Sequence, residues 1–156
     1  MNNKGQITVE YIIIISIILL ILTITLTTIT DQTEKNIILT SAQVGAQIGI
    51  DKNAYAMYYN DTFNNYQENY PKLLNPTEIK IIQINLTESN NQIELQVTLH
   101  TNTKLNSNEK YIIGSRVNYY VRKTIAETYN KKSNDTYYEN IQINNQKIKT
   151  KIVKWV

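Results

Sequence analysis

The sequence predicts an α+β protein in which a long N-terminal hydrophobic helix carries a small, antiparallel, β-rich head domain, as in a lollipop. Three observations support this prediction. Residues 11–30 carry no charged side chain, and no proline occurs before Pro71. The later part of the chain alternates apolar and polar residues, as half-buried strands do. Of the 156 residues, about 120 follow the apolar segment, which is enough for one small domain.

The apolar segment, residues 11–30, is apolar on every side of a helix. As a helix it spans about 30 Å, the thickness of a bilayer core. Such a helix must be buried in lipid or among other helices. Lys4 precedes it, which favours a cytoplasmic N-terminus with the rest of the chain outside. One interpretation is a plain signal anchor. A cleavable secretory signal fits less well, because its apolar region is shorter and a small-residue cleavage site follows it.

The junction before this segment carries a family resemblance. Residues 4–11 read Lys-Gly-Gln-Ile-Thr-Val-Glu-Tyr and lead into an Ile/Leu run. The Gly5-Gln6 junction, the carboxylate of Glu10 and the apolar run together resemble the class III signal peptide of archaeal type IV pilins, most of all those of methanogens. The resemblance implies that a prepilin peptidase cuts between Gly5 and Gln6. Residues 1–5 would then be a leader peptide, and Glu10 would be the fifth residue of the mature chain.

The resemblance also implies a function and a set of partners. The chain would be a structural subunit of an adhesive surface filament, held in the cytoplasmic membrane before assembly and lying outside the cell afterwards. Its partners would be copies of itself and other pilins, the prepilin peptidase, an assembly ATPase and membrane platform proteins. Glu10 would pair with the α-amino group of a neighbouring Gln6, since a charge pair in a dry environment is favoured over either charge alone. The alternative is that Glu10 lies at headgroup level, where a carboxylate costs little.

The helix is predicted to continue past the membrane and to cover residues 6–59. Ser41, Gly45 and Gly49 recur four residues apart, and small residues at that spacing let another backbone approach closely. An equal alternative is that the two glycines weaken or kink the helix, at about 1 kcal/mol each. We expect the head to pack on an apolar stripe of this helix: Val44, Ile48, Tyr55 and Tyr59.

Residues 60–156 are predicted to form the head. Residues 60–75 are expected to be a loop because they are polar and end near two prolines. Residues 78–86 and the strictly alternating residues 93–99 predict a hairpin, with turn residues between them. Residues 101–109 are expected to form a second loop.

The next segment permits two interpretations. Residues 111–113 suit a short strand. Residues 115–129 stay open between helix and strand: their apolar positions recur at helical steps, and the competing strand pattern fails at Lys123. In either case we expect Arg116, Arg122 and Lys123 to be solvated rather than functional.

Residues 137–143 and 147–155 predict a last hairpin. Its turn is the Asn-Asn pair at 144–145, which tolerates positive φ. Alternating lysines on a terminal strand commonly prevent edge pairing, and we expect that role for Lys147, Lys149 and Lys151. The less favoured alternative is contact with an anionic surface, nucleic acid or glycan. We expect Trp155 to be a packing anchor.

Three Asn-X-Ser/Thr sequons begin at Asn60, Asn85 and Asn134. Two of them fall in predicted loops, and Asn85 lies at a predicted strand end. For a secreted filament protein of archaea, N-glycosylation is what the resemblance implies.

The composition argues against an enzyme. Cysteine is absent, so disulfides and thiolate chemistry are excluded. The single histidine, His100, has no cysteine with which to share a metal. GxGxxG, Gly-rich phosphate-loop and HExxH motifs are also absent. We therefore expect no catalytic residue, no cofactor and no metal site. A net charge of +3 neither requires nor excludes an anionic partner, and we do not expect nucleic acid to be one.

Alternatives remain within and outside this class. A minor or assembly-initiating pilin-like protein would share the same N-terminal features. A membrane-tethered binding module that never polymerises would need the apolar helix but not the cleavage junction. The sequence does not name the adhesion target or the filament symmetry.

Overall fold

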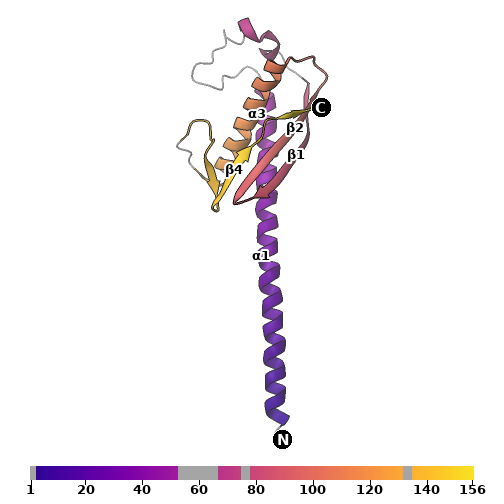
Figure 1. The fold of residues 1–156 in the computed structure, drawn as a ribbon, viewed down its shortest axis with the longest axis vertical. Helices are drawn as coiled ribbons and strands as arrows, with labels where there is room; N and C mark the ends of the chain where they lie inside the picture. Colours follow the sequence, from indigo (N-terminus) through magenta and orange to yellow (C-terminus); the bar gives the residue numbers. More distant parts are fainter. Residues whose placement is uncertain (1–2, 53–66, 75–77, 132–134) are drawn as a thin grey trace. The chain divides into compact units, whose positions relative to one another are not determined.

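The computed structural model describes residues 3–52, 67–74, 78–131 and 135–156, and of residues 3–8 only the backbone. In chain order, its helices and strands are α1 (Asn3–Asp51), η1 (Pro71–Leu74), β1 (Ile79–Ser89), β2 (Gln92–Thr101), α3 (Ser107–Thr128), β3 (Ile141–Ile143), β4 (Gln146–Thr150) and β5 (Lys154–Trp155) (Figure 1). The protein is α+β, with a long apolar helix followed by a small mixed sheet, which confirms the predicted fold class.

The chain divides into two compact units, Met1–Ile37 and Ile38–Val156. The first unit holds the apolar part of α1. The second holds the remaining turns of α1 together with α3 and the sheet, and it contains the buried core. Lys52 already lies outside α1, and residues 53–59 of the predicted helix fall outside the described residues.

The second part of α1 enters the core through its small side chains. Ile38, Ala42 and Ala46 are fully buried. Val44 is 49% exposed and Ile48 is only partly buried, so the expectation that these two form the packing stripe is wrong. The face with small residues allows a closer approach of helices, and close packing favours it over the face with larger side chains. Tyr55 and Tyr59 of that stripe lie outside the described residues.

The first predicted hairpin is confirmed. β1 and β2 pair antiparallel from Ile79↔Thr101 to Ser89↔Gln92, with an irregularity between Ile81 and Gln83. Asn90 and Asn91 close the hairpin with φ of 48° and 57°, as a two-residue primed turn requires. The alternating apolar residues of β2 are at most 1% exposed, as their spacing predicts: Ile93, Leu95, Val97 and Leu99.

β4 lies inside the sheet rather than at its edge. The strand order is β1-β2-β4-β3, and β5 also pairs with β2. β4 and β5 both run parallel to β2, so the expected role of the β4 lysines in preventing edge pairing is wrong. The predicted strand over residues 147–155 is two strands. Between them Ile152 turns outward and is 80% exposed, while Val153 is buried.

The predicted Asn-Asn turn is confirmed, with φ of 45° at Asn144 and 67° at Asn145. It joins β3 and β4, which pair antiparallel. β3 is shorter than the predicted residues 137–143, since it covers only Ile141–Ile143. Tyr138 has a φ of 56°, and this left-handed conformation interrupts an extended strand.

Residues 107–128 are helical. The segment 115–129, which the sequence leaves open between helix and strand, is therefore helix up to Thr128, and the expected strand at 111–113 is wrong. The helix starts with a capping box: Asn106 Oδ1 accepts from the Glu109 backbone N–H at 2.8 Å, and the Glu109 carboxylate accepts from the Asn106 N–H at 2.7 Å. This box satisfies two N–H groups at the start of α3. The predicted loop 101–109 is correspondingly shorter.

α3 is buried on more than one side, so the expectation of solvated arginines is wrong. One side meets α1 at Val117 and the other meets Val153 through Gly114. Arg116 is fully buried. Arg122 is partly buried: its Nη1 donates to Thr150 Oγ1 at 2.6 Å, and its Nη2 donates to the Tyr137 carbonyl at 3.1 Å. Lys123 remains partly exposed and lies 3.8 Å from Glu127.

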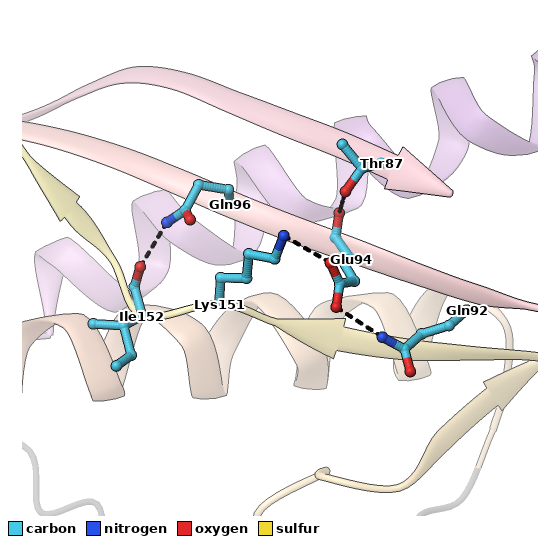
Figure 2. Close-up of polar contacts among 6 residues, drawn as sticks. All are labelled: Thr87, Gln92, Glu94, Gln96, Lys151 and Ile152. Carbon is cyan, nitrogen blue, oxygen red and sulfur yellow. Dashed lines mark hydrogen bonds and ion pairs between the residues drawn. The ribbon is translucent and has the colours of Figure 1, made fainter. Parts of the chain in front are cut away.

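A polar seam joins residues 151–152 to β2 (Figure 2). Lys151 Nζ lies 2.7 Å from Glu94 Oε2, and Gln96 Nε2 donates to the Ile152 carbonyl at 2.6 Å. The Lys151 ammonium, by donating to the Glu94 carboxylate, holds the pKa of that carboxyl below its ordinary value of 4.5. Beyond the end of β4, side-chain contacts therefore hold residues 151–152 against β2 in place of strand pairing.

Candidate assembly segment

Helix α1 carries all the residues of the predicted cleavage junction. Gly5, Gln6 and Glu10 lie in its first turns, within Asn3–Asp51. Only the backbone of Gly5 and Gln6 is described, and the Glu10 side chain is exposed. The carboxylate at the edge of the apolar run is therefore accessible to a partner outside the chain.

The helix surface after Glu10 is apolar and uncovered. Every large apolar side chain from Val9 to Ile29 is between 51% and 64% exposed. Within the described residues this is the one helix long and apolar enough to cross a membrane, judged by length and composition. Water would disfavour so much exposed apolar surface, so this segment requires lipid or other helices around it.

The hydroxyl groups of this segment bond to its own backbone. Ser16, Thr23 and Thr25 donate to the carbonyl four residues earlier at 2.6–2.8 Å. Thr28, Thr30 and Thr33 repeat the pattern at 2.8–3.0 Å. In an apolar environment an unpaired hydroxyl is costly, and these bonds remove that cost. This pairing has a signal in the sequence, because Ser and Thr inside a helix can donate to the carbonyl four residues earlier.

The small residues Ser41, Gly45 and Gly49 meet α3 of the same chain. A Cβ added at Gly45 would lie 2.5 Å from the Tyr120 carbonyl oxygen, and one at Gly49 would lie 2.7 Å from Val117 Cα. Ser41 Oγ donates to Thr128 Oγ1 at 3.0 Å. The two helix backbones therefore approach closely along these residues, and α1 is helical through both glycines.

Only one of the three sequons can be examined in the structure. Asn85 lies on β1, at the sheet edge, with an exposed side chain. Gln83 Nε2 donates to its Oδ1. Asn60 and Asn134 lie outside the described residues.

His100 does not belong to a metal-holding group in the described part of the chain. Its Nδ1 lies 2.8 Å from the Val156 carbonyl and its Nε2 lies 3.2 Å from Asn102 Oδ1. Across the described ranges, no group of three or more His, Asp or Glu residues could hold a metal ion.

Comparison with known families bears on the N-terminal segment. Residues 3–29 match the family model named class III signal peptide. The chain is type IV pilin-like, with a class III signal peptide. Class III signal peptides belong to structural pilin-type substrates of a prepilin peptidase and not to an enzyme family, and the match fits membrane anchoring before assembly. Neither a curated protein nor a solved structure matches the chain.

Proposed function

We propose that this pilin-like chain is a structural subunit of an archaeal type IV pilus-like surface filament that serves adhesion. The observation that carries the proposal is the coincidence of two features in one segment. The class III signal peptide covers residues 3–29, and within that range the large apolar side chains of the helix from Val9 to Ile29 are uncovered. A subunit that polymerises through this helix needs both features.

Cleavage between Gly5 and Gln6 would remove the leader, residues 1–5, and with it the cation of Lys4. The remaining helix would stay in the bilayer because it keeps its apolar residues 11–30. The charge of Lys4 would no longer fix its N-terminus at the cytoplasmic face. Inside lipid, packing rather than the hydrophobic effect favours helix association. Outside lipid, each uncovered Ile or Leu would cost about 1.5–3 kcal/mol relative to burial, so the segment would leave the bilayer only into a bundle of like helices.

Glu10 would guide entry into that bundle. Cleavage creates an α-amino group on Gln6, and the exposed Glu10 of a neighbouring subunit could pair with it. Burying either charge alone is strongly unfavourable, whereas a close pair offsets much of the cost. The assembly ATPase and membrane platform proteins would supply the work of extraction.

The N-terminus of the mature protein tests the first step. Mass spectrometry of the chain from the cell surface should give Gln6 as its first residue. A Gly5→Val variant, with a bulkier residue before the cut, should retain Met1 and form no filaments. Chains that carry Met1 in wild-type filaments would contradict the proposal.

Glu10 is tested by assembly rather than processing. Glu10→Gln and Glu10→Ala chains should be cleaved normally yet give few or no filaments by electron microscopy, with Gln32→Glu as a charge control beyond the apolar segment. Normal filament yield from both Glu10 variants would remove the pairing role.

Two alternatives keep the signal peptide but change the role. A minor or assembly-initiating subunit would be rare in fibres and located at one end, which immunogold labelling distinguishes from even labelling along the fibre. A non-polymerising membrane-tethered module would be absent from fibres altogether.

We also propose N-glycosylation at the sequons. Asn85 is supported by its exposed position on edge strand β1. Asn60 and Asn134 are candidates from sequence alone. Peptide mass spectrometry of surface protein should show a mass increase on at least one of the three, and unmodified peptides at all three would contradict this.

A further inference from the structure

The head contains a groove between the first half of α3 and residues 150–155. It has a volume of about 460 Å³, within the range of about 300–1,000 Å³ found for small-molecule sites. All of its walls belong to the second unit, Ile38–Val156. Every residue that lines the groove lies between Ser107 and Trp155. The proposed assembly through the apolar segment therefore does not account for the groove.

Aromatic rings form much of its wall. Tyr111, Tyr119, Tyr137 and Trp155 line it. Tyr119 is held in place by edge-to-face contacts with Tyr120 at 5.0 Å and Tyr138 at 5.9 Å between ring centroids. Trp155 packs against the core, whereas Tyr111 is 62% exposed at the rim. Rings of this kind offer flat apolar faces and, in Tyr and Trp, a polar group at one end.

The polar groups between these rings are mostly neutral. Asn118 is 9% exposed, and its Nδ2 donates to the Lys151 carbonyl at 2.8 Å. Its Oδ1 has no hydrogen-bond partner among the described residues. The bond from Asn118 Nδ2 ties α3 to the chain at residues 150–155 and so holds this wall of the groove in place. Ser107 and Ser115 add hydroxyl groups to the same wall.

The cationic side chains that line the groove already contact other groups of the chain. Lys110 Nζ lies over the Trp155 ring, 5.8 Å from its centroid. Arg122 donates to Thr150 and Tyr137, and Glu139 adds a negative charge to the wall. Burial raises the pKa of the Tyr119 phenol above its ordinary value of 10.0, so this group is a neutral donor at physiological pH. A ligand would meet aromatic rings and hydroxyl groups, beside charged side chains of both signs.

We propose that this groove binds a neutral saccharide. A pyranose ring has an apolar C–H face that matches the exposed ring of Tyr111, and its hydroxyl groups suit the hydroxyls of Ser107 and Ser115. The inference gives the adhesive role a class of ligand, but the binding itself needs no filament.

The chain provides its own reporter, because Trp155 is its only tryptophan. Full-length protein in detergent micelles should be titrated with glucose, N-acetylglucosamine and the β-linked disaccharide of each, while tryptophan fluorescence is recorded. A saturable change with at least one of these sugars is expected. Tyr111→Ala should weaken binding by about tenfold or more. Ile82→Ala, an equally exposed apolar position on β1 at 56%, should leave it unchanged.

Other outcomes would overturn the proposal. No saturable change with any of the sugars would remove the saccharide site, as would equal binding by wild type and Tyr111→Ala. A response to glucuronate but not to glucose, weakened by salt, would point to an anion site instead. A fluorescence change that depends on protein concentration without sugar would point to a second copy as occupant. None of these results depends on filament formation, so failure here leaves the assembly role standing, and loss of assembly leaves binding measurable.

Discussion

The two halves of helix α1 have the same backbone structure but opposite surfaces. From Val9 to Ile29 the helix presents large Ile and Leu side chains that are more than half exposed. From Ile38 to Ile50 it presents Ala, Ser and Gly residues that are buried against α3 and the core. Among the described residues, the large apolar side chains of the first half are uncovered, whereas the second half packs on α3.

The difference shows how one helix can serve both assembly and folding. Large apolar side chains on all sides suit many neighbours at once, whether lipid or other helices. A narrow face of small residues suits one neighbour at short distance. Intermolecular contacts are thus expected for residues 11–30, while residues 38–51 are already committed to the head.

The largest expected effect follows from placing a charge in the uncovered half. Leu20→Lys puts an ammonium near the middle of the apolar segment, which costs about 2.5–3.5 kcal/mol in a membrane helix. We expect the variant to be lost from the membrane fraction and from fibres, as measured by immunoblot and electron microscopy. Gln43→Lys adds the same charge at an exposed position of the second half and should assemble normally. Equal assembly of the two variants would break the distinction between the halves.

The second expected effect tests the close approach of α1 to α3. Gly45→Ala places a methyl group 2.5 Å from a backbone oxygen that cannot move aside easily, and overpacking of this kind lowers the free energy of unfolding by about 1–3 kcal/mol. Val44→Ala, at a position 49% exposed, should change it by less than about 0.5 kcal/mol. Urea unfolding of the full chain in detergent measures both. Stabilisation by Gly45→Ala, as helix propensity alone predicts, would show that the helices lie further apart.

The smallest expected effect is a loss of stability of the head in acid. Because the pKa of Glu94 is lowered in the folded head, the unfolded chain binds this proton at a higher pH than the native chain does. The contribution of Glu94 to stability is therefore complete above about pH 4.5 and is lost as pH falls through its lowered native pKa. The thermal midpoint of the head should fall over this range, and less so in Glu94→Gln or Lys151→Gln.

The assembly segment should not share that response, since no carboxylate lies between Glu10 and Asp31. Circular dichroism in micelles should show helix retained in acid after the near-ultraviolet signal of the head is lost. Simultaneous loss of both signals would show that acid does not separate the two regions.

Features set by local sequence could be predicted. The β1–β2 hairpin follows from the alternation of residues 93–99 and two asparagines that accept positive φ. The class III signal peptide follows from a short motif beside an apolar run. The spacing of Ser41, Gly45 and Gly49 pointed to close helix packing, although it could not say which helix would be the neighbour.

Features set by distant partners could not be predicted. Arg116 looks like a surface residue by type, and only the packing of α3 on more than one side buries it. Lys147, Lys149 and Lys151 look like residues of an edge strand, because parallel pairing with β2 leaves no mark in their own sequence. The groove lies between the first half of α3 and residues 150–155. No local sequence pattern shows that these distant segments come together.

In the proposed export of this chain, the parallel pairing of β2 has a consequence for the order in which the head matures. One edge of β2 is completed by its hairpin partner β1, made just before it, but the other edge waits for β4 and β5. Until residues 146–156 have been translated and have crossed the membrane, the central strand has an open edge able to pair wrongly. In this order the anchor would insert first and the sheet would close last, and the open edge of β2 would need shielding for most of translocation.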